Sequence, residues 1–251
     1  MKDKVVIITG GAQGIGKCIA DEFRKEGAIV CVIDKAPLSS PQRREDEHFV
    51  GDISKKEVLE EFTRYVIERY GKVDYIINNA MPLFKGIDEC TYDEFLYAQQ
   101  VGVVAPFYLV KLLKDNLAEG ASIVNISSSR DRMSMPQTES YTAAKGGIAA
   151  LTHALAVSLA GKARVNSISP GWIETSEDAS TASGYTEYAG PDATQQPVGR
   201  VGNPMDIANM LLFLCSAKAG FITGENICID GGMTKQMIYH GEHGWSYSTY
   251  S

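Results

Sequence analysis

Four segments of the chain share one pattern of polar and apolar positions. Each runs from a mixed stretch, through a glycine, into a nearly unbroken apolar run: FRKEGAIVCVID, ERYGKVDYIIN, LAEGASIVNIS and SLAGKARVNSIS. The apolar runs show little alternation, which is typical of strands buried on both faces of a parallel sheet. The glycines stand where a residue of left-handed conformation ends a helix, at Gly27, Gly71, Gly120 and Gly161.

The same pattern places the elements along the chain. Helices are predicted from about residue 14 and over 55–70, 93–117 and 139–160; in 55–70, Val58, Phe62 and Val66 recur on one face. Strands that alternate with helices form right-handed βαβ units. The sequence therefore predicts a single-domain, doubly wound α/β fold of the Rossmann type, with about seven parallel strands flanked by helices. The predicted strands are 4–9, 28–34, 48–50, 73–78, 121–127, 164–169 and 226–230.

The length of 251 residues and the hydrophobic content of 44% suit one domain with a sizeable core. We expect that domain to span 1–234 and to include a loop at about 171–200, rich in Ser, Thr, Gly and acidic residues. Loops of such length are often lids or binding loops. Residues 235–251 form a tail with one Trp and three Tyr, which either anchors an interface or is frayed.

Composition narrows the classes of partner. The net charge of −7 and the pI of about 5.2 argue against binding to nucleic acid or to an anionic membrane surface. No apolar run approaches the roughly 20 residues of a membrane span, and the N-terminus lacks a signal-peptide pattern. The five cysteines are scattered without a CxxC, as expected of thiols in a reducing compartment, so we expect a cytoplasmic protein. The four histidines show no metal-binding spacing, and no metal is expected.

The segment VVIITGGAQGIG at 5–16 places glycines between the first strand and the first helix. Gly10, Gly14 and Gly16 would let backbone N–H groups approach a pyrophosphate at the helix N-terminus, where the helix dipole favours an anion. The spacing differs from the common GxGxxG, and a tight turn without a ligand is the alternative. Asp34 ends the second strand, where a carboxylate binds ribose hydroxyls and repels a 2′-phosphate, which favours NAD. The alternatives are a surface turn at Asp34 and weaker discrimination because of Lys35.

Tyr141 and Lys145 in YTAAK lie one helical turn apart. A phenol has a pKa of about 10, and a neighbouring ammonium lowers it toward the range useful for acid–base catalysis. The pair follows IVNISSS, whose Ser128 lies at the carboxyl end of a buried strand, where α/β proteins bind ligands. Ser128 can donate a hydrogen bond to a carbonyl or alkoxide oxygen, or simply satisfy a turn. Arg130 and Arg132 follow, either as a solvated rim or as ligands for an acidic substrate group.

Together these segments resemble the short-chain dehydrogenase/reductase family, over the chain to about Thr234. The matching segments are TGGAQGIG, GDIS at 51–54, NNA at 78–80, Ser128 with YTAAK, SPGWIET at 169–175 and FITGENICIDGG at 221–232. The resemblance implies a catalytic set of Ser128, Tyr141 and Lys145. It implies a cofactor-binding set of Gly10, Gln13, Gly14, Ile15, Gly16, Asp34, Asp52, Ile53, Asn79, Tyr141, Lys145, Ile173 and Thr175.

The resemblance also implies individual roles. Asp52 and Ile53 would hold the adenine, and Asn79 would lie near the adenosine ribose. Lys145 would bind the nicotinamide ribose while tuning the proton-transferring Tyr141, and Ser128 would fix the substrate oxygen. The Ile173 backbone and the Thr175 side chain would hold the nicotinamide carboxamide. The family pairs its long helices, here 93–117 and 139–160, so a homodimer or homotetramer is expected.

Two positions depart from the family pattern. Met81 replaces the glycine of NNAG and would narrow the space near the nicotinamide. Gly102 replaces an Asn that helps to carry a water-linked proton relay to the lysine, and a glycine has no side chain for that role. An ordered water could take the place. Gln99 and Gln100 would point elsewhere on a helix.

Two main functions are consistent with these observations, and a lyase or epimerase that reuses the cofactor is a further alternative, although the short chain leaves little room for an added substrate domain. The first is an NAD-dependent oxidoreductase that interconverts a secondary alcohol and a ketone on a small molecule, with Tyr141 as general acid and base. The alternative, motivated by Gly102 and Met81, is a dinucleotide-binding protein with weak or no catalysis, acting as a sensor or scaffold.

Overall fold

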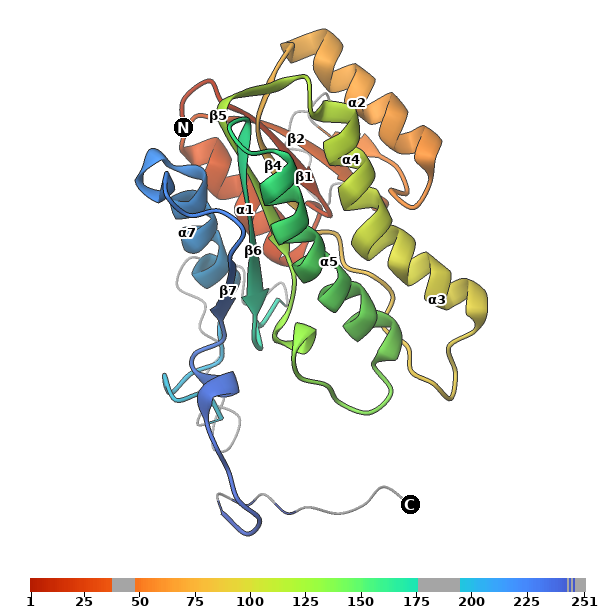
Figure 1. Ribbon diagram of the computed structural model, residues 1–251, viewed down its shortest axis with the longest axis vertical. Coiled ribbons are helices and arrows are strands. Elements are labelled where there is room, and N and C mark those ends of the chain that lie inside the picture. The colour runs from red at the N-terminus through yellow and green to blue at the C-terminus, as the bar shows by residue number, and fades with distance from the viewer. Residues whose placement is uncertain (38–47, 176–194, 243, 245, 247–251) are drawn as a thin grey trace.

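The computed structural model describes residues 1–37, 48–175, 195–242, 244 and 246 (Figure 1). Within them, seven strands form one sheet in the order β3-β2-β1-β4-β5-β6-β7, and each neighbouring pair is parallel. This confirms the predicted doubly wound parallel sheet. The strands are β1 (Val5–Thr9), β2 (Ile29–Asp34), β3 (His48–Val50), β4 (Val73–Asn78), β5 (Leu117–Ile126), β6 (Ala163–Pro170) and β7 (Asn226–Ile229).

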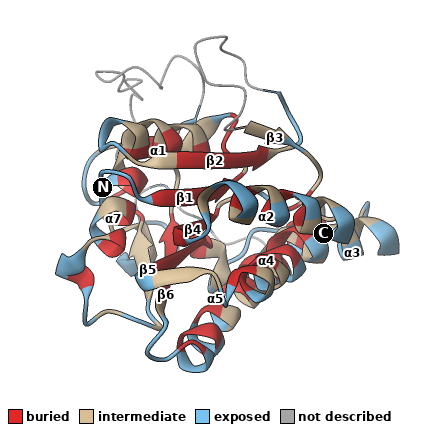
Figure 2. Cartoon of the chain, turned by 90° about the horizontal axis from the view of Figure 1, so that it is seen from above, coloured by how far each residue is buried: buried red, intermediate tan, exposed pale blue. Residues whose placement is uncertain are grey.

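Helices cover both faces of the sheet, and Figure 2 shows buried residues along the strands and on the helices that cover them. On one face lie α1 (Gly14–Lys25) and α7 (Pro204–Cys215); on the other lie α2 (Lys56–Tyr70), α4 (Ala105–Leu113) and α5 (Glu139–Ser158). In β1, Val6 and Ile8 pack toward α1 and α7, whereas Val5 and Ile7 pack toward the other three helices. Both sides of the strand are therefore buried, which explains the lack of alternation in the sequence.

Three of the four glycines predicted to end helices do so. Gly27, Gly71 and Gly161 have φ values of 81°, 74° and 77° and follow α1, α2 and α5. The prediction for Gly120 is wrong, because α4 ends and β5 begins before it. Gly120 also has a positive φ, 73°, but it lies inside the strand. A left-handed glycine thus marks a bend in the backbone, and the bend is not always a helix end.

The helix predicted at 93–117 is three consecutive segments that end earlier. It comprises α3 (Tyr92–Gln99), a π-helical turn η2 (Gln100–Val104) and α4. By length and composition alone, Tyr92–Leu113 would suffice to cross a membrane, contrary to the expectation from the sequence. Its buried residues Val101, Ala105 and Leu109, however, belong to the core between the sheet and α5. We interpret it as a covering helix of the sheet.

Gly102 lies in the π-helical turn, where this helix crosses α5. A Cβ atom at residue 102 would lie 2.7 Å from the Ala144 Cβ atom and 3.3 Å from the Pro82 Cβ atom. The first distance is shorter than real Cβ contacts, so the two helices approach too closely for any side chain here. The family asparagine therefore has no room at this position while Ala144 remains.

This contact predicts an unusual response to substitution. Gly102→Ala should destabilise the protein by about 1 kcal/mol, because the collision outweighs the gain of about 1 kcal/mol that alanine brings to a helix. In an Ala144→Gly background the same change should instead stabilise it. Urea unfolding of the four proteins gives the coupling energy. Independent effects at the two positions would contradict the proposed contact.

Candidate active site

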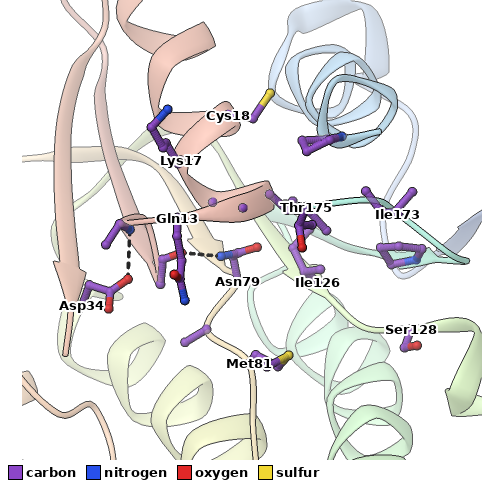
Figure 3. A pocket seen from close by; sticks show the side chains of 18 of the residues that line it. Gln13, Lys17, Cys18, Asp34, Asn79, Met81, Ile126, Ser128, Ile173 and Thr175 are labelled. Atoms are coloured by element: carbon purple, nitrogen blue, oxygen red, sulfur yellow. Dashed lines mark hydrogen bonds between the residues drawn. The ribbon is translucent and has the colours of Figure 1, made fainter. Parts of the chain in front are cut away.

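All the residues predicted to bind the cofactor or to act in catalysis line one cleft of about 1100 Å³ (Figure 3). The cleft opens at the carboxyl ends of the strands, beside the turn between β1 and α1. The predicted residues in its wall are Gly10, Gln13, Gly14, Ile15, Gly16, Asp34, Asp52, Ile53, Asn79, Ser128, Tyr141, Lys145, Ile173 and Thr175.

The N-terminus of α1 lacks the groups that usually satisfy a helix start. Its cap residue Gln13 makes no side-chain capping hydrogen bond, and its first turn contains no acidic residue. By contrast, α3 and α7 begin with complete capping boxes, Thr91 with Glu94 and Asn203 with Asp206. Unpaired N–H groups and the positive end of a helix dipole therefore face the cleft, and this fits a bound diphosphate.

The glycines of the turn are required mainly by its own packing. A Cβ atom on Gly16 would collide with the Gly10 carbonyl oxygen, and one on Gly10 would lie 2.7 Å from the Ala80 Cα atom. Gly10 and Gly14 also have positive φ values, 72° and 54°. At Gly14 a Cβ atom would lie 3.4 Å from Thr175 Cβ, across the cleft. Of the three glycines, Gly14 is the one whose bare backbone faces another wall of the cleft.

Thr9 and Asn79 fasten the turn to the end of β4. The Thr9 hydroxyl accepts hydrogen bonds from the backbone N–H groups of Asn79 and Ala80, both at 3.1 Å. Asn79 Nδ2 in turn donates to the Gly10 carbonyl oxygen at 2.8 Å. Asn79, expected near the ribose, thus also holds the turn, as Figure 3 shows. Sequence reasoning missed Thr9, although a polar residue between an apolar strand and glycines marks the position.

Asp34 closes the other side of the turn. Its Oδ2 atom accepts a hydrogen bond from the Ala12 N–H at 2.9 Å, and its Oδ1 atom accepts one from the Ala36 N–H at 2.9 Å. These bonds fix the carboxylate at the end of β2, on the wall of the cleft.

Lys35 is engaged with a different carboxylate. Its ammonium donates to the Tyr97 hydroxyl at 2.9 Å and lies 3.4 Å from Asp52 Oδ2. Burial raises the pKa of Asp52, but hydrogen bonds from Ser54 and the charge of Lys35 outweigh it and lower that pKa. Asp52, expected to hold the adenine, is therefore ionised and tied to Lys35. Tyr97, which sequence reasoning missed, completes this cluster.

Ser128, Tyr141 and Lys145 come together at the other end of the cleft. Ser128 follows β5, while Tyr141 and Lys145 lie one turn apart at the start of α5. The Lys145 ammonium is buried, donates to the Ile126 carbonyl oxygen at 2.7 Å and lies 5.4 Å from the centre of the Tyr141 ring. The predicted spacing therefore places the three side chains in one wall.

The electrostatics differ from the expectation. Burial raises the pKa of Tyr141, and a hydrogen bond with Ser128 and the charge of Arg130 only partly oppose this. Lys145, expected to lower the pKa of Tyr141, is so buried that its own pKa falls to about 7. Its ammonium form is therefore disfavoured in the protein without cofactor, because a buried charge loses its hydration.

Neighbouring loops complete the wall. Ser140 Oγ accepts the Lys85 N–H at 2.8 Å and lies 3.0 Å from the Leu83 carbonyl oxygen, which ties the loop after β4 to α5. Gln99 Nε2 donates to the Ser140 carbonyl oxygen at 3.1 Å, so it does not replace the missing asparagine side chain.

Met81 lines the cleft and is 73% exposed, so it stands at the mouth and leaves the interior open.

The predicted substrate loop is described only in part. Ile173 forms a β-bridge with Gly202, which anchors the start of the loop to the segment before α7. Residues 176–194 lie outside the described residues, as do Trp245, Tyr247 and Tyr250 of the tail. The described tail residues Met237 and Tyr239 are exposed.

The sheet, the uncapped α1 turn and the wall that contains Ser128, Tyr141 and Lys145 are together typical of dinucleotide-binding α/β oxidoreductases. Residues 10–234 match the protein family described as enoyl-(acyl carrier protein) reductase. An uncharacterized oxidoreductase of Thermotoga maritima is 41% identical over 253 residues, covering 95% of this chain and 99% of that protein. The chain belongs to the short-chain dehydrogenase/reductase family.

Solved structures agree with this assignment. An apo SCOR enzyme from Clostridium thermocellum has a TM-score of 0.88 and 41% identity, with all of both chains covered. A 4-hydroxyisoleucine dehydrogenase, solved with NADH, has a TM-score of 0.79 and 28% identity, covering 94% of this chain and 100% of that one.

The depressed pKa of Lys145 predicts a stability effect with a definite sign. Because the folded pKa of about 7 lies below the unfolded value of 10.5, the burial penalty is fully present below pH 7 and is relieved as the pH rises toward 10.5. The shift corresponds to a penalty of about 5 kcal/mol at pH 6, and loss of the hydrogen bond to the Ile126 carbonyl oxygen offsets roughly 2–3 kcal/mol of it. Without cofactor, Lys145→Met should therefore stabilise the protein at pH 6 by roughly 2–3 kcal/mol, and the gain should shrink by pH 9.

Urea unfolding at several pH values measures this difference. The exposed Lys218, changed to Met, serves as the control and should show no such trend. A pH-independent difference for Lys145→Met, or a loss of stability at pH 6, would contradict the inferred burial of the charge.

Proposed function

We propose that this protein is an NAD-dependent oxidoreductase that interconverts a secondary alcohol and a ketone on a small molecule. The observation that carries the proposal is a single cleft with an uncapped helix N-terminus at one end and Ser128, Tyr141 and Lys145 at the other. The related dehydrogenase structure that contains NADH supports a nicotinamide cofactor.

The chain offers a partner for each part of such a cofactor. The N–H groups at Gln13–Gly16 would bind the diphosphate, and Asp34 the adenosine ribose. Lys145 would bind the nicotinamide ribose, and the carboxamide would lie at Ile173 and Thr175. When bound, the nicotinamide supplies the hydride acceptor or donor; the protein aligns it and controls the proton.

The proton would pass through Tyr141. During alcohol oxidation its phenolate oxygen accepts the hydroxyl proton, and during reduction its hydroxyl returns a proton to the carbonyl oxygen. Ser128 donates a hydrogen bond to that same oxygen and stabilises its negative charge. Because burial raises the pKa of Tyr141, the opposing effects of Ser128 and Arg130 are needed for proton exchange near neutral pH.

The choice of NAD over NADP rests on charge. Asp34 is held at the end of β2 by the Ala12 and Ala36 N–H groups. There it would bind the adenosine ribose and repel a 2′-phosphate. The nearest following cation, Lys35, is directed to Tyr97 and Asp52, so it neither neutralises Asp34 nor offers a free ammonium there.

A dinucleotide-binding protein with little or no catalysis is the second candidate, and Gly102 is the observation that favours it. Residue 102 contributes no polar side chain to a proton relay, and the Ala144 contact excludes one. Calorimetric NAD binding without NADH formation across a broad alcohol panel would establish this alternative.

We also propose that copies of the chain pair through α4 and α5. Val104 and Phe107, at the end of η2 and on α4, and Val157 on α5 are exposed apolar residues, which support the pairing expected for the family.

Removing the Tyr141 hydroxyl tests the acid–base role. Tyr141→Phe should lower kcat by about 100-fold or more, while the Kd for NAD measured by calorimetry stays within threefold. Tyr108→Phe, on α4 and outside the lining of the cleft, is the control and should leave both unchanged. Full turnover by Tyr141→Phe would refute the role of this residue.

Removing the Asp34 carboxylate tests cofactor choice. Asp34→Ala should lower the ratio of kcat/KM for NAD to that for NADP by about 10- to 100-fold, because a ribose partner is lost and a repulsion is relieved. Steady-state kinetics with each cofactor measure the ratio. An unchanged ratio would mean that Asp34 does not select the cofactor.

A further inference from the structure

Arg130 lies beside the reacting end of the cleft in an unusual setting. It stands in the short 3-10 helix η3 (Ser129–Asp131) that follows β5, and its backbone N–H donates to Ser128 Oγ at 3.2 Å. Its guanidinium carbon lies 4.7 Å from the centre of the Phe84 ring and 5.9 Å from that of the Tyr141 ring. The two rings are 5.3 Å apart, so the cation rests against an aromatic pair that includes the proposed acid–base residue.

The charge of Arg130 has no carboxylate partner among the described residues. Its Nη1 atom is buried and makes no hydrogen bond, and its Nη2 atom meets only the Met135 sulfur, at 3.0 Å. A thioether is a weak acceptor, so the strongest donors of this side chain are essentially unused. Arg132, two residues on, shows the usual arrangement, with Asp131 accepting from Nε at 2.8 Å and from Nη2 at 3.2 Å.

An unpaired guanidinium at such a place is costly unless a ligand completes it. The buried Nη1 donor without an acceptor loses the free energy of its former hydration, and a carboxylate that meets the guanidinium recovers part of it through charge-assisted hydrogen bonds. Aromatic rings against the guanidinium restrict its motion, which lowers the entropy lost on binding. The Ser140 contacts with Leu83 and Lys85 hold the loop that carries Phe84. The Arg130 guanidinium is therefore already held in a position to bind an anion.

Building on the proposed function, we propose that Arg130 binds a carboxylate of the substrate, and that the substrates are therefore hydroxy acids and the corresponding keto acids. The reacting oxygen lies between Ser128 and Tyr141, and Arg130 adjoins both residues. The carboxylate consequently sits within a few carbon atoms of the carbon that exchanges the hydride.

The test compares substrates that differ only in charge. Oxidation of 2-hydroxybutanoate and 3-hydroxybutanoate, and of their methyl esters, is followed by NADH formation with the wild type, Arg130→Met, Arg130→Lys and Arg132→Gln. In the wild type, at least one acid should exceed its ester in kcat/KM by tenfold or more. Arg130→Met should lower kcat/KM for that acid by about 10- to 100-fold. The fold loss in kcat/KM for the ester should be at least ten times smaller than the loss for the acid.

Two control variants distinguish the paired hydrogen bonds of a guanidinium from the effect of a positive charge alone. Arg130→Lys keeps the charge without the two-pronged geometry and should recover only part of the loss. Arg132→Gln removes the same charge from a guanidinium that Asp131 already engages, and should preserve the preference for the acid. No preference for acids in the wild type, or a preference that survives Arg130→Met, would overturn the proposal. An equal loss for acid and ester, with a shifted pH profile, would mean that Arg130 acts only through the pKa of Tyr141 and binds no carboxylate, and this would also overturn the proposal.

A binding measurement keeps this inference separate from the proposed reaction. Butanoate, which has a carboxylate but no hydroxyl, is titrated calorimetrically into the NAD-saturated protein, with methyl butanoate as the neutral comparison. Tighter binding of butanoate, weakened tenfold or more by Arg130→Met and not by Arg132→Gln, supports the carboxylate site even if no alcohol is oxidised. Equal binding of the acid and the ester refutes the site even if neutral alcohols are turned over.

Discussion

The cleft depends on one electrostatic arrangement, a helix that begins without a cap. The start of α1 leaves its N–H groups unpaired toward the cleft, whereas α3 and α7 satisfy theirs with capping boxes. The Thr9 hydroxyl and the Asn79 amide hold the turn in place, so its open N–H groups do not depend on a bound anion for their position. A preformed site of this kind would bind a diphosphate without first ordering the loop.

The opposite end of the cleft is governed by burial. Burial raises the pKa of Tyr141 and lowers that of Lys145, so both groups are driven toward their neutral forms. A neutral phenol cannot accept a proton, and the permanently charged Arg130 is therefore the cation that favours the phenolate in the protein without cofactor. Arg130 is also the proposed ligand of the substrate carboxylate. The charge of the substrate would therefore affect the ionisation of Tyr141 through Arg130.

Much of the fold followed from the sequence, since burial on both faces leaves apolar runs that single-sequence reasoning detects. The strand ends placed Asp34 and Ser128 at one edge of the sheet, and helical spacing placed Tyr141 beside Lys145. The prediction that Gly120 ends a helix was wrong because a glycine with positive φ also occurs within a strand.

Contacts between distant segments could not be predicted in this way. The collision at Gly102 depends on how closely α5 crosses the π-helical turn, and the roles of Thr9 and Ser140 depend on loops folding back. The setting of Arg130 requires Phe84 to arrive from the loop after β4. A local pattern identifies which residues carry chemistry, but the packing decides which of them meet.

The most direct test is a crystal structure of the protein with NAD bound. The diphosphate should accept hydrogen bonds from the N–H groups at Gln13–Gly16, and the nicotinamide ring should face the Tyr141 hydroxyl across the cleft. A diphosphate bound elsewhere, or a nicotinamide directed away from Tyr141, would contradict the proposed site.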